Sequence, residues 1–246
     1  MSEVIRILTI DEDALFDCSK ESLDHFPRIR SVEDYKDSEY IKEQWEDYYD
    51  KYENAWELSI LRNAPQIYFR VPFLLKPCGE ISRVGCHDEA LKHIAMLFPS
   101  LCPFGRQMQV VIDNIDQHHD LYVMHGTDKL DCSNWAYPKF VKQFIPSVGL
   151  YKYNWFYTNL SDDYGFISDC ALNGIKYTGY KIPIRQFTDV VVNRGQIYDM
   201  IIFCTSRAYV PKNYWQVFDG MYDSVIRFNS KLRKLNDFAD EWFKGV

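Results

Sequence analysis

Residues 164–182, YGFISDCALNGIKYTGYKI, hold two runs of strand-forming residues on either side of Asn173-Gly174. Asn-Gly favours a two-residue hairpin turn, because both turn positions need a positive φ. The stretch therefore predicts two antiparallel strands, Tyr164–Leu172 and Ile175–Ile182.

The flanking sequence predicts further strand pairs. Thr188–Asn193 and Gln196–Thr205 surround Arg194-Gly195 in the same manner. Upstream, Gln109–Ile115 and Leu121–His125 are expected to form a third pair through the polar turn 116–120. Strands gathered in this way are typical of an antiparallel sheet built from hairpins in the C-terminal half.

Helical patterns stand before and after these strands. Asp88–Phe98 has apolar residues at helical spacing and is followed by Pro99, while Pro138–Ile145 begins with proline at its first position. The last helix carries an apolar stripe between Tyr222 and Trp242. The predicted fold class is therefore α+β, with an antiparallel sheet packed with helices.

A long acidic amphipathic helix is predicted near the N-terminus, from about Glu39 to Leu61. One face carries Ile41 and four aromatic residues at steps of three and four, and acidic side chains outnumber basic ones at the remaining positions. We interpret this helix as an interface, with these residues: Trp45, Tyr48, Tyr52, Trp56, Glu43, Glu46, Asp47 and Asp50. The expected organisation is an acidic helical segment at 1–63 and an α+β main domain at 64–246.

Charge is distributed unevenly over the 246 residues. Residues 1–63 hold 17 acidic and 8 basic side chains, whereas the remainder holds 18 acidic and 20 basic ones. The near-neutral remainder provides no strong basic field, so nucleic acid is not an expected partner. We expect a protein partner or self-association, with the acidic helix docking on a basic surface.

The seven cysteines indicate a reducing compartment. Their number is odd and no two have C-x-x-C spacing, which argues against a disulfide framework. The apolar runs are too short to cross a bilayer, and no signal peptide is recognisable. The expected location is the cytoplasm, or the virion if a virus encodes the chain.

Common nucleotide and hydrolase motifs are missing. The sequence has no G-x-x-x-x-G-K-[ST] loop, no G-x-G-x-x-G and no G-x-S-x-G. We therefore expect no enzyme and no cofactor, and no small-molecule substrate is identified.

The densest polar cluster offers an alternative. Asp113, Asp116, His118 and His119 have the side chains to hold a divalent metal and activate water, as in a hydrolase or nuclease. Their spacing matches no named metal motif, and a polar turn explains them equally well. The expectation is a solvated hairpin turn without a catalytic role.

Two further sites are considered and set aside. Cys78, Cys86, His87, His93 and Cys102 lack the spacing of a structural zinc site, so they are interpreted as free thiols and ordinary histidines. The aromatic strand Tyr151–Tyr157, with Lys139, Lys142 and Lys152 near it, has residues that could stack on unpaired bases, but core packing explains it as well.

These observations favour a non-enzymatic interaction or assembly component. The abundance of Tyr, Ile, Asp and Asn is typical of AT-rich genomes, including many phages, which suggests a structural protein encoded by a virus or phage. The alternatives are the metal-dependent hydrolase or nuclease, and a single-stranded nucleic-acid binding module or inhibitor of host defence.

Overall fold

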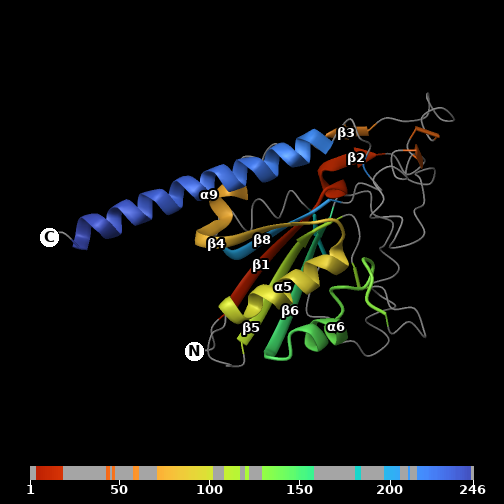
Figure 1. The fold of residues 1–246 in the computed structure, drawn as a ribbon. Coiled ribbons are helices and arrows are strands. Elements are labelled where there is room, and N and C mark those ends of the chain that lie inside the picture. The colour runs from red at the N-terminus through yellow and green to blue at the C-terminus, as the bar shows by residue number, and fades with distance from the viewer. Residues whose placement is uncertain are drawn as a thin grey trace.

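The centre of the fold is a parallel sheet, which Figure 1 shows in the computed structural model. The structure describes residues 4–18, 43–44, 46–47, 58–60, 71–101, 108–116, 120–121, 129–157, 181–183, 197–205, 210 and 215–244. Within them, six strands lie in the order β4-β8-β1-β5-β6-β7, and each neighbouring pair is parallel. The strands are β1 (Val4–Asp11), β4 (Leu75–Val84), β5 (Met108–Ile115), β6 (Val148–Tyr157), β7 (Lys181–Pro183) and β8 (Tyr198–Cys204).

The predicted antiparallel sheet is therefore wrong, and the fold is α/β. The stretch expected to return as a hairpin strand, at 196–205, contains β8, which pairs in parallel with β1 and with β4. Likewise β5 lies between two parallel neighbours, β1 and β6. Hairpin signals act only on adjacent residues, whereas parallel pairing is decided by packing between segments far apart in sequence. Residues 158–180, including Asn173-Gly174, lie outside the described part.

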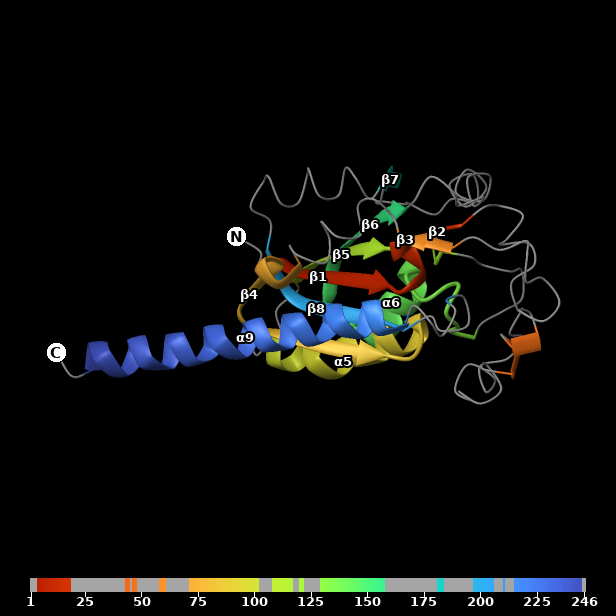
Figure 2. The same ribbon diagram turned by 90° about the horizontal axis from the view of Figure 1, so that it is seen from above.

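Helices cover the two faces of the sheet, as Figures 1 and 2 show. The helices α5 (His87–Leu101) and α6 (Pro138–Phe144) pack on one face, where their apolar residues share a core with alternate residues of β1, β5 and β6. The helix α9 (Trp215–Lys244) lies on the other face, where Phe218 and Tyr222 pack edge-on against Phe203. Burial on both faces explains why the central strands are almost continuously apolar.

Several predicted elements are confirmed at the level of the single segment. The helix expected at 88–98 is α5, which continues past Pro99 to Leu101. The helix expected at 138–145 is α6, with Pro138 at its start, and the strand expected at 151–157 lies within β6. Before β4, which lies at one edge of the six-stranded sheet, residues Val71–Leu74 form a 3-10 helix, η2.

The N-terminal segment is part of the sheet. Residues 1–63, which the sequence sets apart as an acidic helical segment, supply β1 to the middle of the strands of residues 64–246. After β1 the chain forms η1 (Asp13–Leu15) and β2 (Phe16–Cys18), and β2 pairs antiparallel with β3 (Leu58–Ile60). Most of the expected helix at 39–61 lies outside the described residues.

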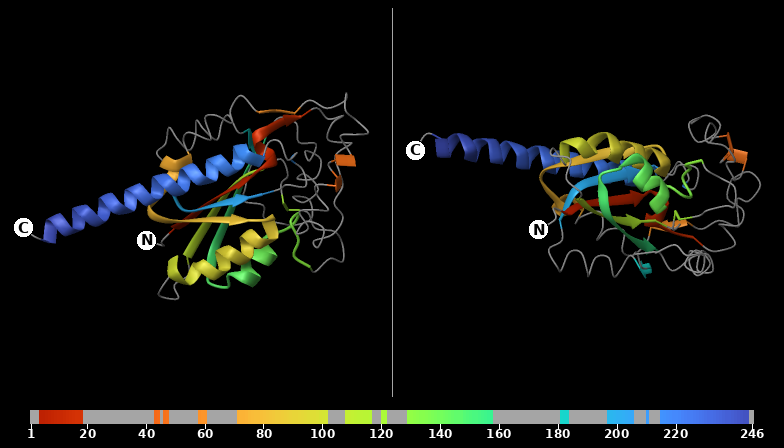
Figure 3. Two further views of the ribbon diagram at one scale, coloured as in Figure 1. Left: turned by 45° about the horizontal axis from the view of Figure 1, so that its top comes forward. Right: turned by 90° about the horizontal axis from the view of Figure 1, so that it is seen from below.

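The views in Figure 3 show that the C-terminal part of α9 extends beyond the sheet. Near the sheet, the side chains of Asn229 and Arg233 donate hydrogen bonds to the carbonyl of Gly79 in β4. Among the described residues, no helix combines the length and the apolar character needed to cross a membrane.

Candidate functional site

The candidate site lies at the carboxyl edge of the sheet, between β1 and β5. The chain after β1 leads to β4 on one side of the sheet, whereas the chain after β5 leads through α6 to β6 on the other side. Loops that leave neighbouring strands in opposite directions open a crevice, and ligands of parallel α/β sheets bind at such switch points. Asp11 ends β1 here, and Asp116 follows the last residue of β5.

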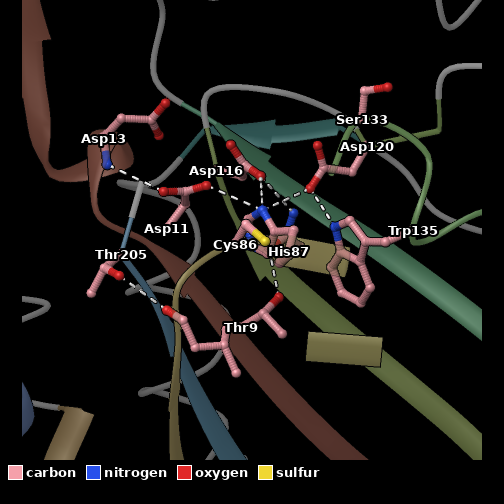
Figure 4. A network of polar contacts seen from close by, with 12 residues as sticks. Thr9, Asp11, Asp13, Cys86, His87, Asp116, Asp120, Ser133, Trp135 and Thr205 are labelled. Atoms are coloured by element: carbon pink, nitrogen blue, oxygen red, sulfur yellow. Dashed lines mark hydrogen bonds and ion pairs between the residues drawn. The ribbon is translucent and has the colours of Figure 1, made fainter. Parts of the chain in front are cut away.

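Three carboxylates converge on a single atom at this edge (Figure 4). The Nδ1 atom of His87 lies 3.1 Å from Asp11 Oδ2, 3.3 Å from Asp116 Oδ2 and 3.0 Å from Asp120 Oδ2. All four side chains are buried. One N–H group donates one good hydrogen bond, so the three oxygens compete for it, and the cluster gathers more carboxylates than this single N–H can satisfy.

His87 reaches this point because it is the first residue of α5, directly after the short turn that ends β4. The helix start is held by Glu89, whose carboxylate accepts a hydrogen bond from the backbone of Gly85 at 2.9 Å. Helix N-termini favour negative charge, which suits the gathered carboxylates. Burial alone would lower the pKa of His87, but the surrounding thiol and carboxylate groups outweigh it and raise this pKa well above its ordinary value.

Asp120 is held in an unusual backbone conformation. Its φ is 52°, and it is the non-glycine residue with a positive φ within the described part of the chain. Aspartate tolerates this left-handed region better than most residues. The Asp120 carbonyl accepts a hydrogen bond from the N–H of Ala136 at 3.2 Å, and its carboxylate accepts one from the indole N–H of Trp135. Backbone strain of this kind clusters at functional sites.

Asp116 is oriented by a chain of polar side chains. Asn114 donates from Nδ2 to Asp116 Oδ2 at 3.1 Å and to the hydroxyl of Tyr153 at 2.8 Å. The amide oxygen of Asn114 in turn accepts a hydrogen bond from the hydroxyl of Thr9 at 2.5 Å. Trp155 donates to the Asp116 carbonyl at 2.8 Å. This buried network fixes Asp116 through residues of three adjacent strands.

Asp13 adds a further carboxylate from η1. Its backbone N–H lies 3.4 Å from Asp11 Oδ1, within reach of a weak hydrogen bond. Oxygens of Asp11, Asp13 and Asp116 all lie within 4.8 Å of one another, close enough for one cation to bind them together. Carboxylate oxygens are the donors that hard cations such as Mg²⁺ and Mn²⁺ prefer.

The predicted cluster at 113–125 is divided by the sheet. Asp116 and Asp120 belong to the site, and both are buried, so the expectation of a solvated turn is wrong for them. Asp113 lies elsewhere: it accepts hydrogen bonds from Asn154 Nδ2 at 2.5 Å and from the Tyr198 hydroxyl at 2.7 Å. Asp113 and Asp116 are three positions apart, so their side chains point to opposite faces of the sheet, because side chains alternate along a strand.

Other residues singled out in the sequence fall mostly outside the described part. His118 and His119 lie there, as do four aromatic residues and one acid of the predicted interface, namely Trp45, Tyr48, Tyr52, Trp56 and Asp50. The remaining interface residues, Glu43, Glu46 and Asp47, are helical and exposed. Cys86, considered for zinc, donates from Sγ to Asp88 Oδ1 at 2.6 Å.

Sequence reasoning missed Asp11 and Asp13, and it set His87 aside as an ordinary histidine. A signal for the first two exists: a largely apolar stretch from Val4 to Ile10 is followed directly by Asp11-Glu12-Asp13. Acids directly after a buried parallel strand lie at the ligand-binding edge. His87 has no comparable signal, because its role depends on the placement of α5.

Comparison with protein-family models finds no match, and comparisons with curated proteins and with solved structures find none either. The functional argument therefore depends on the geometry of the site.

Proposed function

We propose that this chain is a divalent-cation-dependent enzyme that hydrolyses phosphate esters. The observation that carries the proposal is the cluster of buried carboxylates at the carboxyl edge of the sheet, where Asp11, Asp116 and Asp120 converge on Nδ1 of His87 and Asp13 lies beside Asp11 and Asp116. The imidazolium of His87 supplies one positive charge against these three carboxylates. Bringing several carboxylates together in a buried place is costly, and a bound cation offsets that cost.

The donor chemistry favours a hard cation. Asp11 and Asp116 belong to the set of three carboxylates that also includes Asp13, and all three can offer an oxygen to one ion. Mg²⁺ is commonly bound through a few carboxylates, and substrate phosphate oxygens and water complete its coordination. This coordination preference of Mg²⁺, together with the position of the site at a switch point of the sheet, indicates a phosphate ester as the substrate.

The reaction assigns separate roles to the residues. The cation supplies Lewis-acid polarisation of the phosphoryl group. Asp11 and Asp116 would hold the bound cation, and the N–H of His87 would donate toward developing negative charge. Water attacks phosphorus, the ester P–O bond breaks, and Asp13 accepts the proton of the attacking water and returns it to the leaving oxygen. The products are an alcohol and a phosphate with one ester bond fewer.

Cation binding and hydrolysis test this proposal on the full chain. We expect Mg²⁺ or Mn²⁺ to raise the melting temperature. At a cation concentration of 100 times the dissociation constant, the free energy of unfolding should increase by about 2.7 kcal/mol. We also expect cation-dependent release of nitrophenol from p-nitrophenyl phosphate or its bis ester. Asp116→Asn should lower the rate at least about 100-fold, because it removes a ligand rather than an outer group.

The matched control is Asp219→Asn. Asp219 lies on α9, on the other face of the sheet, where it pairs with Arg83. This variant should keep both cation binding and hydrolysis. An unchanged melting temperature and no heat in a calorimetric titration would refute the cation site. Cation binding without hydrolysis of either ester would refute the enzyme.

A further inference from the structure

Beside the carboxylates, the site contains a buried thiol. Cys204 ends β8 and lies opposite Asp11 in the parallel register of β8 and β1. The backbone fixes this pairing, since the N–H of Glu12 donates to the Cys204 carbonyl at 3.0 Å. Cys204 is fully buried and forms no disulfide. The parallel register therefore places its side chain on the same face of the sheet as that of Asp11.

His87 has a second ring nitrogen to offer. Its Nδ1 faces the carboxylates, while its Nε2 is buried and has no hydrogen-bond partner within the described part of the chain. The His87 side chain is 3% exposed, so bulk water does not form a hydrogen bond with Nε2. A buried ring nitrogen without a partner is costly unless something binds it.

Ligand atoms of Asp11, His87 and Cys204 lie within 4.8 Å of one another. A tetrahedral zinc ion with bonds of 2.0–2.3 Å holds its ligand atoms about 3.4–3.8 Å apart. Side-chain rotations that move the ligand atoms by about 1 Å would thus suffice for all three to bind one zinc ion. Three protein ligands leave a fourth position for water.

We propose that Asp11, His87 and Cys204 bind a borderline transition-metal ion, of which Zn²⁺ is the type, at a position distinct from the all-carboxylate set. Sulfur and imidazole donors select such ions over Mg²⁺, which prefers oxygen. Because Asp11 belongs to both ligand sets, the two ions compete for it. Zn²⁺ is then an inhibitor of the hydrolysis, a consequence that rests on the proposed function.

Cobalt tests the ligand set directly, because Co²⁺ replaces Zn²⁺ and is coloured. Added to the reduced full chain, one equivalent of Co²⁺ should give a sulfur-to-cobalt charge-transfer band in the near ultraviolet, and Zn²⁺ should abolish it. Cys204→Ser should lose the band. Cys86→Ser and Cys132→Ser, which alter other described thiols, should keep it. A band that survives Cys204→Ser would overturn the proposal.

A second measurement needs no variant. X-ray absorption at the zinc edge of the wild-type protein should show one sulfur scatterer per zinc, and a shell of nitrogen and oxygen alone would overturn the proposal. These spectra do not depend on hydrolysis. If the enzyme proposal fails, the cobalt band is still expected; if the band is absent while Mg²⁺-dependent hydrolysis is present, only the zinc site fails.

Discussion

Trp135 stacks on His87, with ring centroids 5.2 Å apart and an angle of 15° between the rings. The same indole donates its N–H to Asp120. One buried side chain thus contacts two of the groups that converge at the carboxyl edge. It restricts the ring of His87 and the carboxylate of Asp120 at once, as groups behind metal ligands commonly do.

Replacing this indole should loosen the site without removing a ligand. Trp135→Phe keeps an aromatic ring against His87 but deletes the hydrogen bond to Asp120. We expect the affinity for Mn²⁺ to fall about 10-fold, at the lower end of such effects. Calorimetric titration measures it, and Trp215→Phe is the control, because Trp215 donates to the carbonyl of Val210 instead. Equal affinity in both variants would contradict a positioning role for Trp135.

The hydrogen bond from Thr9 to Asn114 should contribute to stability. Thr9→Val keeps the shape of the side chain but leaves the buried amide oxygen of Asn114 without this donor. The expected cost is about 1–3 kcal/mol in the free energy of unfolding, measured with urea. Thr205→Val should cost less, because the carbonyl that Thr205 contacts, that of Val84, also accepts the backbone N–H of Thr205. A larger loss for Thr205→Val would argue against this account.

Asp113 should make stability depend on pH. Burial raises the pKa of Asp113 above its ordinary value of 3.8, although hydrogen bonds from Asn154 and Tyr198 oppose the shift. A raised pKa favours the protonated form in the folded protein, so the contribution is present at low pH and is lost as pH rises through the folded-state pKa. Asp113→Asn does not ionise, so its stability relative to the wild type should increase from about pH 4 toward neutrality. Parallel pH profiles of the two proteins would contradict this.

Assembly through the acidic helix stays a prediction, and the fold changes how it must be tested. Deleting residues 1–63 removes β1 from the centre of the sheet, so no folded remainder is expected. Reversing the exposed acids Glu43 and Glu46 to lysine leaves the sheet intact. If this surface docks on a basic one, the reversal and about 0.5 M salt should each weaken association, because salt screens exposed charges. Sedimentation at several concentrations measures it, and association unchanged in both tests would contradict the prediction.

The sequence determined the local elements. Proline at the start of α6, helical spacing in α5 and alternation in β6 each predict an element whose cause lies within a few residues of it. The largely apolar sequences of β1, β5 and β8 also carried information about the fold, because strands buried on both faces need no alternation. The hairpin signal Asn173-Gly174 was given more weight, and the sequence therefore predicted an antiparallel sheet.

Only the tertiary structure decided the order of the strands and the site. Asp11, His87, Asp116 and Cys204 are separated by tens of residues or more, and no local pattern connects them. They meet because parallel pairing sets the carboxyl ends of β1, β5 and β8 at one edge and brings the start of α5 against them. Asp113 and Asp116 are close in sequence but lie on different faces of the sheet, because successive side chains of a strand point to opposite faces.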